Sequence, residues 1–544
     1  MTEPRWPLRA VPAHLQERYV NEGWWTGATL GGRVAEWLAA APDAGVHIHS
    51  RTHDWHGTYA DIDAEARRLV SVLRREGIEP GEVVAFQIPN WREAVVTFAG
   101  LAMGGYILVP ITHIYDRKEV SFILEECGAV AYISPTAYGH VDYADIVDRS
   151  EGIGLRLHLV VGDGTDRPAP DGVHRVGWDE LAGCEPVAEL PELADADVAV
   201  LAYTSGTTSD PKGAIHDHRT LLSELEHMAA WMTSNRPNLM GSPVAHATGM
   251  LGGVLGPLYT SSDIHLTDRW DPGHALEVML TYDIGGGVGA SIFLTSLLDH
   301  PDFTPEHAAK MVRVGLGGAP VPAAVGQRAE SLGIKIIRAY GSTEHPSITG
   351  SRYEDPAELR HNTDGRPRPG VEMRIVDEDG NDLPAGTPGE VVSRGPELCL
   401  GYTNPDLNVA FDDDGWYHTG DIGTLDEHGC LTITDRVKDI IIRGGENLSA
   451  AEIEEVIAKV PGVAEVAVVA APDERLGEHA CAMVRLLPGA DPIDLPALIP
   501  HLEQAGLARQ KWPEELRLVD DYPRTASGKI RKVDLRSLLR EGAF

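Results

Sequence analysis

The residue types best suited to binding or catalysis are concentrated in one short loop. Tyr203-Thr-Ser-Gly-Thr-Thr-Ser-Asp-Pro-Lys-Gly213 combines hydroxyl side chains, two glycines and a lysine directly after an apolar run. Glycines let backbone N–H groups approach an anion closely, the hydroxyls add donors, and Lys212 adds a positive charge. The loop therefore predicts a phosphate site with a helix soon after it. It is not a Walker A loop, because Pro211 precedes the lysine and Gly213 follows it. Composition alone leaves a polar surface loop equally open.

Four further segments carry candidate groups. They are Gly317-Gly-Ala-Pro320, Ala339-Tyr-Gly-Ser-Thr-Glu344, Trp416-Tyr-His-Thr-Gly-Asp421 and Pro523-Arg-Thr-Ala-Ser-Gly-Lys529. A carboxylate such as Glu344 suits a hard cation that bridges phosphates, and acidic residues often bind ribose hydroxyls. Taken singly, Asp421 could equally be a turn residue, and the competing interpretation for Lys529 is a solvated basic tail.

In this order along the chain, the five segments resemble the adenylate-forming superfamily. That superfamily contains acyl-CoA synthetases, the adenylation domains of nonribosomal peptide synthetases, and the firefly luciferases. The resemblance runs from the phosphate loop to Lys529, and two departures are visible. Ser209 and Asp435 stand where the family usually has glycine, and the sequence leaves their effect open.

The resemblance implies a role for each matching residue. Tyr340 would stack on adenine, Asp421 and Arg436 would bind the ribose, and Lys529 would neutralise charge shared by the substrate carboxylate and the α-phosphate. The implied catalytic residues are Lys529, Glu344, His246 and Lys212, and Mg²⁺ would be held by Glu344 and Thr208. The implied ATP- and AMP-binding residues are Thr204, Ser205, Gly206, Thr207, Thr208, Lys212, Gly317, Gly318, Ala319, Pro320, Tyr340, Gly341, Thr343, Asp421 and Arg436.

The C-terminal part is expected to move between two half-reactions. Lys438 falls at the family's hinge position, and Gly444 and Gly445 resemble the loop that lines the tunnel for the thiol. The resemblance thus predicts an adenylate-forming domain over residues 1–435 and a mobile domain over residues 436–544. Gly444-Gly445 is equally compatible with an ordinary turn.

The acyl pocket is assigned by resemblance to His246, Gly287, Gly289, Ala290, Ser291 and Gly315, with His246 as its gate. The run Ile284-Gly-Gly-Gly-Val-Gly-Ala-Ser291 has few side chains and leaves volume, which favours a bulky apolar acid that is alicyclic, polycyclic or branched. Residues 285–295 contain no charged side chain, which disfavours a second carboxylate or an amino acid. The competing interpretation is that the glycines only permit close strand packing.

The elements that must position these residues alternate between strand and helix. Residues 58–76, 91–103, 218–232 and 321–332 have helical spacing, and residues 83–88, 106–111, 128–134, 198–203, 312–316 and 334–340 read as strands. Such alternation favours parallel sheets covered by helices. After about Pro367 the short strands 371–376, 389–394 and 430–433 indicate a small β-rich subdomain. The tail combines helices at 451–460 and 493–505 with strands at 466–471 and 481–486, as in a small α+β domain.

Composition narrows the function classes. The 544 residues carry a net charge of −36, which repels nucleic acid, so phosphate ligands must be held by a few placed groups. Three of the nine lysines are Lys212, Lys438 and Lys529. Five cysteines without a CxxC pair disfavour disulfides and a zinc site. No apolar run approaches a membrane span, so a cytoplasmic protein without nucleic-acid or membrane partners is expected.

The leading hypothesis is an AMP-forming acid–CoA ligase that uses ATP, Mg²⁺ and CoA. The second hypothesis is a stand-alone adenylating enzyme that loads a carrier protein, since both share the first step. The third is a catalytically silent nucleotide-binding regulator, and the fourth is a luciferase-type oxygenase. The resemblance also allows a homodimer, and the sequence does not name the acid.

Overall fold

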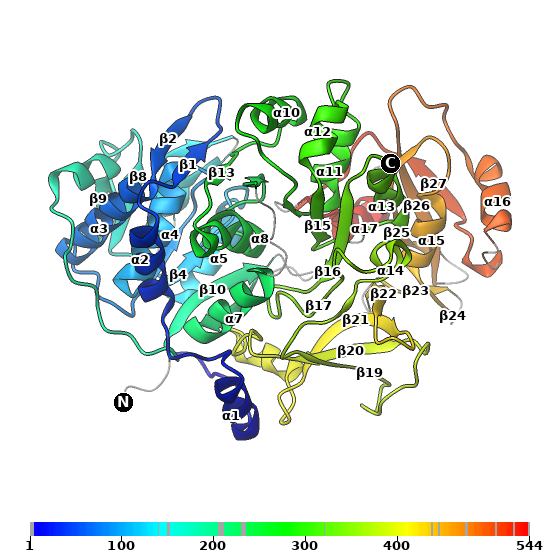
Figure 1. The fold of residues 1–544 in the computed structure, drawn as a ribbon, viewed down its shortest axis with the longest axis horizontal. Helices are drawn as coiled ribbons and strands as arrows, with labels where there is room; N and C mark the ends of the chain where they lie inside the picture. Colours follow the sequence, from blue (N-terminus) through cyan, green and yellow to red (C-terminus); the bar gives the residue numbers. More distant parts are fainter. Residues whose placement is uncertain are drawn as a thin grey trace.

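The computed structural model (Figure 1) describes the chain except for residues 1–4, 140, 150–152, 205–210, 230–235, 320, 437–438, 444–445, 474–476, 506, 508, 526–527 and 542–544. Its helices are α1 (Ala13–Asn21), α2 (Leu30–Ala40), α3 (Tyr59–Arg75), α4 (Arg92–Gly104), α5 (Arg117–Cys127), α6 (Tyr143–Asp148), α7 (His218–Ala229), α8 (Ala247–Gly249), α9 (Gly256–Thr260), α10 (Pro272–Thr281), α11 (Ser291–Leu298), α12 (Pro305–Lys310), α13 (Ala323–Ser331), α14 (Ala357–Asn362), α15 (Ala450–Ile457), α16 (Leu495–Gln504) and α17 (Lys532–Glu541).

The largest sheet has the strand order β11-β10-β4-β3-β5-β8-β9. Its strands are β3 (Val83–Phe86), β4 (Ile107–Pro110), β5 (Ala131–Pro135), β8 (Leu157–Val161), β9 (His174–Gly177), β10 (Val198–Thr204) and β11 (Lys212–Asp217). All neighbouring pairs are parallel except β10 and β11. Val84 and Phe86 of β3 pack into one core and Val83 and Ala85 into another. The sheet is therefore covered on both faces, which explains its continuous apolar strands.

Helix α3 illustrates how local sequence fixes an element. The Thr58 N–H donates to the Asp61 carboxylate at 2.8 Å, and the Asp61 N–H donates to the Thr58 hydroxyl at 3.3 Å. This reciprocal pair caps the first turn. The apolar face that includes Ile62, Leu69 and Leu73 is fully buried, and α3 packs against α4 and α2.

A second sheet lies beside the first and has the order β12-β13-β1-β2. Its strands are β1 (Gly45–Ile48), β2 (Trp55–Thr58), β12 (Leu239–Met240) and β13 (Ile264–Leu266). β1 runs parallel to β13 and antiparallel to β2, so segments more than 200 residues apart share one sheet. A short hairpin of β6 (Ala137–Tyr138) and β7 (Val141–Asp142) stands apart from both sheets.

The third sheet has the order β14-β15-β16-β17-β18, and its strands contain the predicted site residues Gly289, Gly315, Gly317 and Tyr340. Its strands are β14 (Val288–Gly289), β15 (Arg313–Gly317), β16 (Lys335–Tyr340), β17 (Thr349–Gly350) and β18 (Arg366–Pro367). The first three are parallel, and the loop from β16 to β17 contains Glu344. The expected helix 321–332 is α13, which starts after Pro322 and packs on β16.

Two smaller sheets complete the fold. The antiparallel sheet β19-β20-β21-β22 consists of β19 (Glu372–Val376), β20 (Gly389–Arg394), β21 (Tyr417–Leu425) and β22 (Leu431–Arg436), and it is the β-rich part expected after Pro367. The C-terminal sheet consists of β23 (Ile441–Arg443), β24 (Glu446–Leu448), β25 (Val463–Asp473), β26 (Gly477–Leu486) and β27 (Glu515–Leu518). Its own apolar core includes Ile453, Val468 and Leu498. The predicted α/β architecture with a small α+β C-terminal part is confirmed.

The helix expected soon after the phosphate loop is α7, but a strand that the sequence did not predict precedes it. Lys212–Asp217 forms strand β11, which returns antiparallel to β10, and only then does α7 begin at His218. The run from Gly213 to Asp217 is buried against the sheet, which favours pairing over a helical turn. The phosphate loop therefore connects two antiparallel strands.

Two expectations from the composition concern disulfide bonds and membrane-spanning helices. All five cysteines are free. Among the described residues, no helix combines the length and apolar character needed to cross a bilayer.

Candidate active site

The phosphate loop is anchored by a pair of residues at its two ends. Thr204 at the end of β10 lies opposite Lys212 at the start of β11. Ser205, Gly206, Thr207 and Thr208, together with Ser209, lie outside the described residues. The hairpin therefore brings the two flanking positions of the loop together at one edge of the large sheet.

Lys212 and Glu344 both lie close to one tyrosine, Tyr402. The Lys212 Nζ lies 5.9 Å from the centroid of the Tyr402 ring, within range of a cation–π contact. The Tyr402 hydroxyl donates to the Glu344 Oε1 at 2.7 Å, and Glu344 is only 8% exposed. Burial and the nearby Glu344 carboxylate raise the pKa of Tyr402, so the phenol stays protonated and can donate. A buried carboxylate oriented in this way offers the oxygen ligands that Mg²⁺ prefers.

The loop that holds Glu344 is fixed at its backbone. A Cβ atom on Gly341 would stand 1.9 Å from the Pro346 carbonyl oxygen, so only glycine fits this turn. The His216 Nε2 donates to the Thr343 carbonyl oxygen at 2.8 Å from strand β11. The Cys399 N–H donates to the Glu344 carbonyl oxygen at 2.8 Å. The motif is therefore tied to the phosphate-loop hairpin and to the segment before Tyr402.

A buried polar network lies behind this loop. The Glu397 carboxylate contacts the His345 Nε2 at 3.0 Å and the His227 Nδ1 at 3.3 Å, and all three side chains are almost fully buried. These two histidines hold the pKa of Glu397 well below its usual range despite its burial. The Ser347 hydroxyl donates to Glu224 at 2.6 Å. The network links α7 to His345 and Ser347, which directly follow Glu344 in the loop.

Tyr340 and Asp421, two residues predicted to bind the nucleoside, are in direct contact. The Tyr340 hydroxyl donates to the Asp421 Oδ2 at 2.7 Å, and Asp421 is buried. Asp421 lies opposite Arg436 across strands β21 and β22. The structure thus brings together three residues that the sequence places 81 and 15 positions apart.

The C-terminal motif reaches the end of β15. A Cβ atom on Gly318 would stand 3.6 Å from the Lys529 Cε, and one on Gly528 would stand 2.8 Å from Ile292 at the start of α11. Gly317 ends β15 against Ala339, and Ala319 follows in the turn, whereas Pro320 lies outside the described residues. Burial and the positive charge of Lys529 lower the pKa of the half-buried His246 to about 3. Lys529 is therefore close to both β15 and His246.

An apolar cavity of about 50 Å³ lies beside this point. Its walls consist of apolar side chains and glycines, without an ionisable group: Leu239, Met240, Gly241, Trp270, Met279, Ile284, Gly285, Gly287, Val288, Gly289, Ala290, Phe293, Leu294, Leu297, Met311, Val314 and Leu316. Gly287, Gly289 and Ala290 of the predicted acyl pocket line it. Ser291, Gly315 and His246 do not, although Ser291 begins α11 and Gly315 pairs with Val288.

The glycines of this region differ in how much room a side chain would have. A Cβ atom on Gly286 would stand 2.1 Å from the Arg313 carbonyl oxygen, so that glycine permits close strand packing. A Cβ atom on Gly287 would have no neighbour closer than 3.6 Å. A methyl group at residue 287 would therefore make ordinary van der Waals contacts, so close packing accounts for Gly286 but does not require glycine at 287.

Some residues of the site carried no signal in the sequence. Tyr402 and Glu397 come from an irregular segment, and their partners Glu344 and His345 lie more than 50 positions away. Lys438, Gly444 and Gly445 lie outside the described residues, so their hinge and tunnel roles stay predictions.

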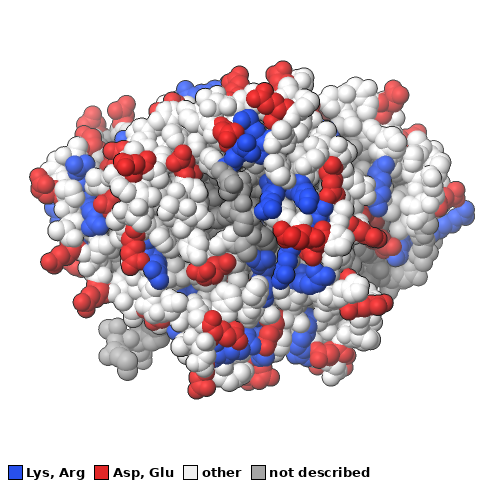
Figure 2. Space-filling view, in the orientation of Figure 1, with Lys and Arg blue, Asp and Glu red and all other residues white. Residues whose placement is uncertain are grey.

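The surface around the centre of the molecule is more basic than its net charge suggests. Figure 2 shows Asp and Glu side chains scattered over the visible face, with several Lys and Arg side chains gathered toward its middle among a few acidic ones. A local group of cations of this kind can attract an anionic substrate against an acidic background.

Comparison with known proteins identifies the family. The AMP-binding enzyme model matches residues 34–403, and the AMP-binding enzyme C-terminal domain model matches residues 452–529. The medium-chain fatty-acid–CoA ligase of Escherichia coli is 32% identical over 530 residues, covering 95% of this chain and 92% of that protein. A methyl-dioxo-octahydroindenyl-propanoyl:CoA ligase of Mycobacterium tuberculosis is 36% identical over 500 residues, covering 87% and 95%. The ATP-bound crystal structure of MatB from Rhodopseudomonas palustris superposes with a TM-score of 0.81 at 27% identity, covering 94% of this chain and 100% of that one. The chain therefore belongs to the AMP-binding enzyme family, within the adenylate-forming superfamily, and is an AMP-forming acid–thiol ligase.

Proposed function

We propose that this enzyme joins a bulky apolar carboxylic acid, alicyclic, polycyclic or branched, to CoA. The observation that carries the proposal is the apolar cavity with a lysine near it. Strand β14 forms part of the cavity wall and leads into helix α11. Ile292 at the start of α11 contacts Gly528, the residue before Lys529. An acid with its tail in this cavity would present its carboxylate toward the Lys529 ammonium.

The first step forms an acyl-adenylate. A carboxylate oxygen attacks the α-phosphorus of ATP, the bond to the bridging oxygen breaks, and pyrophosphate leaves. Lys529 and Lys212 would spread the negative charge, and Glu344, with Thr208, would hold Mg²⁺ on the phosphates. Tyr340 and Asp421 would hold the nucleoside, with Arg436 as a further donor.

The second step forms the thioester. The CoA thiol gives up its proton to solvent and its sulfur attacks the acyl carbon of the mixed anhydride, the bond to the phosphate oxygen breaks, and AMP leaves with the electron pair. Gly444 and Gly445 would line the thiol path after rotation about Lys438. In this proposal the domains are residues 1–435 and 436–544.

The choice of a bulky acid is supported by the composition of the cavity wall. Three methionines line the cavity, and their flexible side chains can move to admit a ring larger than the present volume. A relative that is 36% identical is named for an octahydroindenyl-propanoyl group, which is a bicyclic acid. Another relative is named for medium-chain fatty acids, so linear chains of similar volume are the natural comparison.

A substrate panel tests this proposal. Enzyme, ATP and Mg²⁺ are incubated with acetate, octanoate, cyclohexane carboxylate and a bicyclic propanoic acid, each with CoA or with a phosphopantetheinylated carrier protein, and thioesters are detected by mass spectrometry. We expect CoA thioesters with the cyclic acids at the highest kcat/KM. Faster reaction with acetate would overturn the bulky-acid assignment. Product with carrier protein alone would overturn CoA as the acceptor.

A further inference from the structure

A cluster of histidines lies outside the active site on the sheet β12-β13-β1-β2. His47 of β1 pairs with His265 of the parallel neighbour β13 and with His56 of the antiparallel neighbour β2. Val46 and Ile48, on either side of His47, are fully buried in the core below the sheet. Because side chains alternate along a strand, the three paired histidines share the opposite face. Asp263 precedes β13 and approaches the same place.

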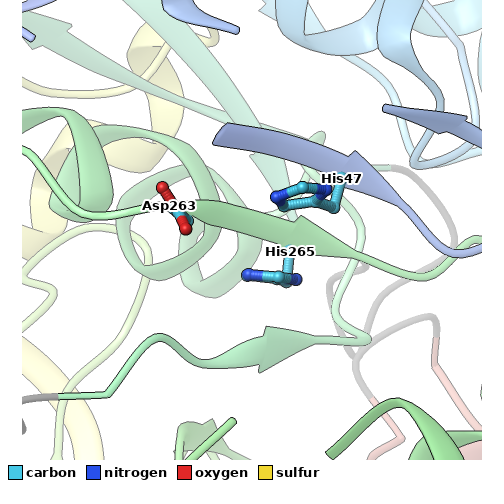
Figure 3. A group of neighbouring side chains, drawn as sticks. All are labelled: His47, Asp263 and His265. Atoms are coloured by element: carbon cyan, nitrogen blue, oxygen red, sulfur yellow. The ribbon is translucent and has the colours of Figure 1, made fainter. Parts of the chain in front are cut away.

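The side chains of His47, Asp263 and His265 converge on one point. One nitrogen or oxygen ligand atom from each residue lies within 4.8 Å of the others. The two imidazole rings are nearly parallel, with centroids 4.5 Å apart. Figure 3 shows both rings with one nitrogen directed to the side on which the Asp263 carboxylate stands.

Further histidines orient the two rings. The Nδ1 atoms of His47 and His56 lie 2.9 Å apart, and the His265 Nδ1 lies 3.0 Å from the His49 Nε2. The His56 Nε2 in turn lies 3.4 Å from the Asp54 carboxylate. If His47 and His265 each donate from Nδ1, their Nε2 lone pairs face outward. This is the arrangement in which proteins present histidine to a metal, with the second ring nitrogen held by a hydrogen bond.

Gly45 provides the space that this arrangement needs. A Cβ atom on residue 45 would stand 2.4 Å from the His47 Nε2 and 3.2 Å from the Asp263 Cγ. The Gly45 N–H also donates to the Asp263 Oδ1 at 2.7 Å and holds the carboxylate in place. The absence of a side chain at this position allows the imidazole and the carboxylate to approach each other.

We propose that His47, His265 and Asp263 bind a divalent transition-metal ion, with His56 and His49 as positioning residues. Two imidazoles and one carboxylate match the donor sets of zinc and of other late first-row ions, and they disfavour Mg²⁺ and Ca²⁺, which select oxygen. Asp263 is exposed, so the ion can enter from solvent and keep water in its remaining positions. The ion would join β13 to β1 and stabilise the folded state.

Metal titration tests the site. Tag-free full-length enzyme is stripped with chelator and titrated with Zn²⁺ by calorimetry, and Co²⁺ absorption reports the ligand geometry. We expect one equivalent of Zn²⁺ and a rise in Tm with Zn²⁺ concentration. His47→Ala and His265→Ala should lose the saturable binding. His56→Ala and His49→Ala should weaken Zn²⁺ binding by about 10–100-fold, because losing a hydrogen bond that orients a metal ligand has an effect of this size.

Two variants separate the built site from a histidine-rich segment. Gly45→Ala retains all five side chains but places a methyl group against the His47 Nε2, and we expect it to lose binding, with its metal-free Tm as the folding control. His53 belongs to the same stretch of sequence but stacks on Trp91 with ring centroids 3.6 Å apart. His53→Ala should bind Zn²⁺ like the unmodified enzyme. Equal weakening in His53→Ala and His47→Ala, or saturable binding that persists in His47→Ala, would overturn the proposal.

Discussion

The Lys529 side chain lies against Gly318, a residue more than 200 positions earlier at the end of β15. A Cβ atom on residue 318 would stand 3.6 Å from the Lys529 Cε and 4.0 Å from its Nζ. Gly318 has a φ of +75°, which glycine adopts at little cost. The contact joins the C-terminal motif to the parallel strands beside the apolar cavity. This is the arrangement that the adenylation step would need.

Replacement of this lysine should therefore separate the two half-reactions. Lys529→Ala removes the positive charge near the developing phosphate charge, and we expect adenylation to slow by about 100–1000-fold. Thioester formation from supplied acyl-adenylate should change much less. Pyrophosphate exchange and AMP release measure the two steps. Lys511→Ala, whose lysine pairs with Glu452 at the surface, is the matched control. Equal losses in both steps would contradict the assigned role.

The hydroxyl of Tyr402 should control how well Glu344 binds Mg²⁺. Tyr402→Phe removes the donor 2.7 Å from the Glu344 Oε1. A lost hydrogen bond to a buried carboxylate costs about 1.5–3 kcal/mol, so the Mg²⁺ concentration for half-maximal rate should rise about tenfold or more. Tyr259→Phe, which removes an exposed hydroxyl bonded to Glu226, should leave it unchanged. A loss of kcat with an unaltered Mg²⁺ dependence would show that the hydroxyl acts elsewhere.

Neighbouring glycines of the cavity should respond differently to substitution. Gly287→Leu adds a large side chain to the cavity wall and should lower kcat/KM for a cyclic acid by about 10–100-fold relative to a short acid, because losing room for one or two methylenes costs a few kcal/mol. Gly286→Ala would clash with the Arg313 carbonyl oxygen and should lower Tm instead. Initial rates with paired acids and thermal unfolding distinguish the two effects. An unchanged acid preference in Gly287→Leu would remove this residue from the pocket.

The buried network predicts a pH dependence of stability. Burial raises the pKa of Glu224 to about 8, whereas the unfolded value is about 4.3. The folded protein thus holds a proton that the unfolded chain releases between these values. The stabilisation that this Glu224 proton gives the folded state is fully present below about pH 4.3 and is lost as pH rises through about 8. Glu224→Gln cannot titrate, so its free energy of unfolding should fall less steeply from pH 5 to 8.

Denaturant unfolding at several pH values measures this difference. Glu226→Gln, an exposed position on the same helix α7, should retain the pH dependence of the unmodified enzyme. Parallel curves for Glu224→Gln and the unmodified enzyme would mean that Glu224 is ionised in the folded state.

Most strands and long helices could be predicted because their apolar spacing is local. The expected helix 58–76 is α3, and the expected strand 389–394 is β20. The exception is β11, a strand between the phosphate loop and the expected helix α7 that the apolar spacing did not predict. The backbone groups of β11 are hydrogen-bonded by pairing with β10 and by a bridge from Ala214 to Tyr402. No local pattern encodes these partners.

The sequence by itself determined the order of the motifs, and with it the family, the α/β architecture and the class of reaction. Motif residues are recognisable because phosphate, ribose and carboxylate chemistry restricts the residue type at each position. Only the tertiary structure decided which side chains support them: Tyr402 on Glu344, Tyr340 on Asp421, and Lys529 against Gly318. These contacts depend on how distant strands are brought together, and the same holds for the histidines that meet across β13, β1 and β2.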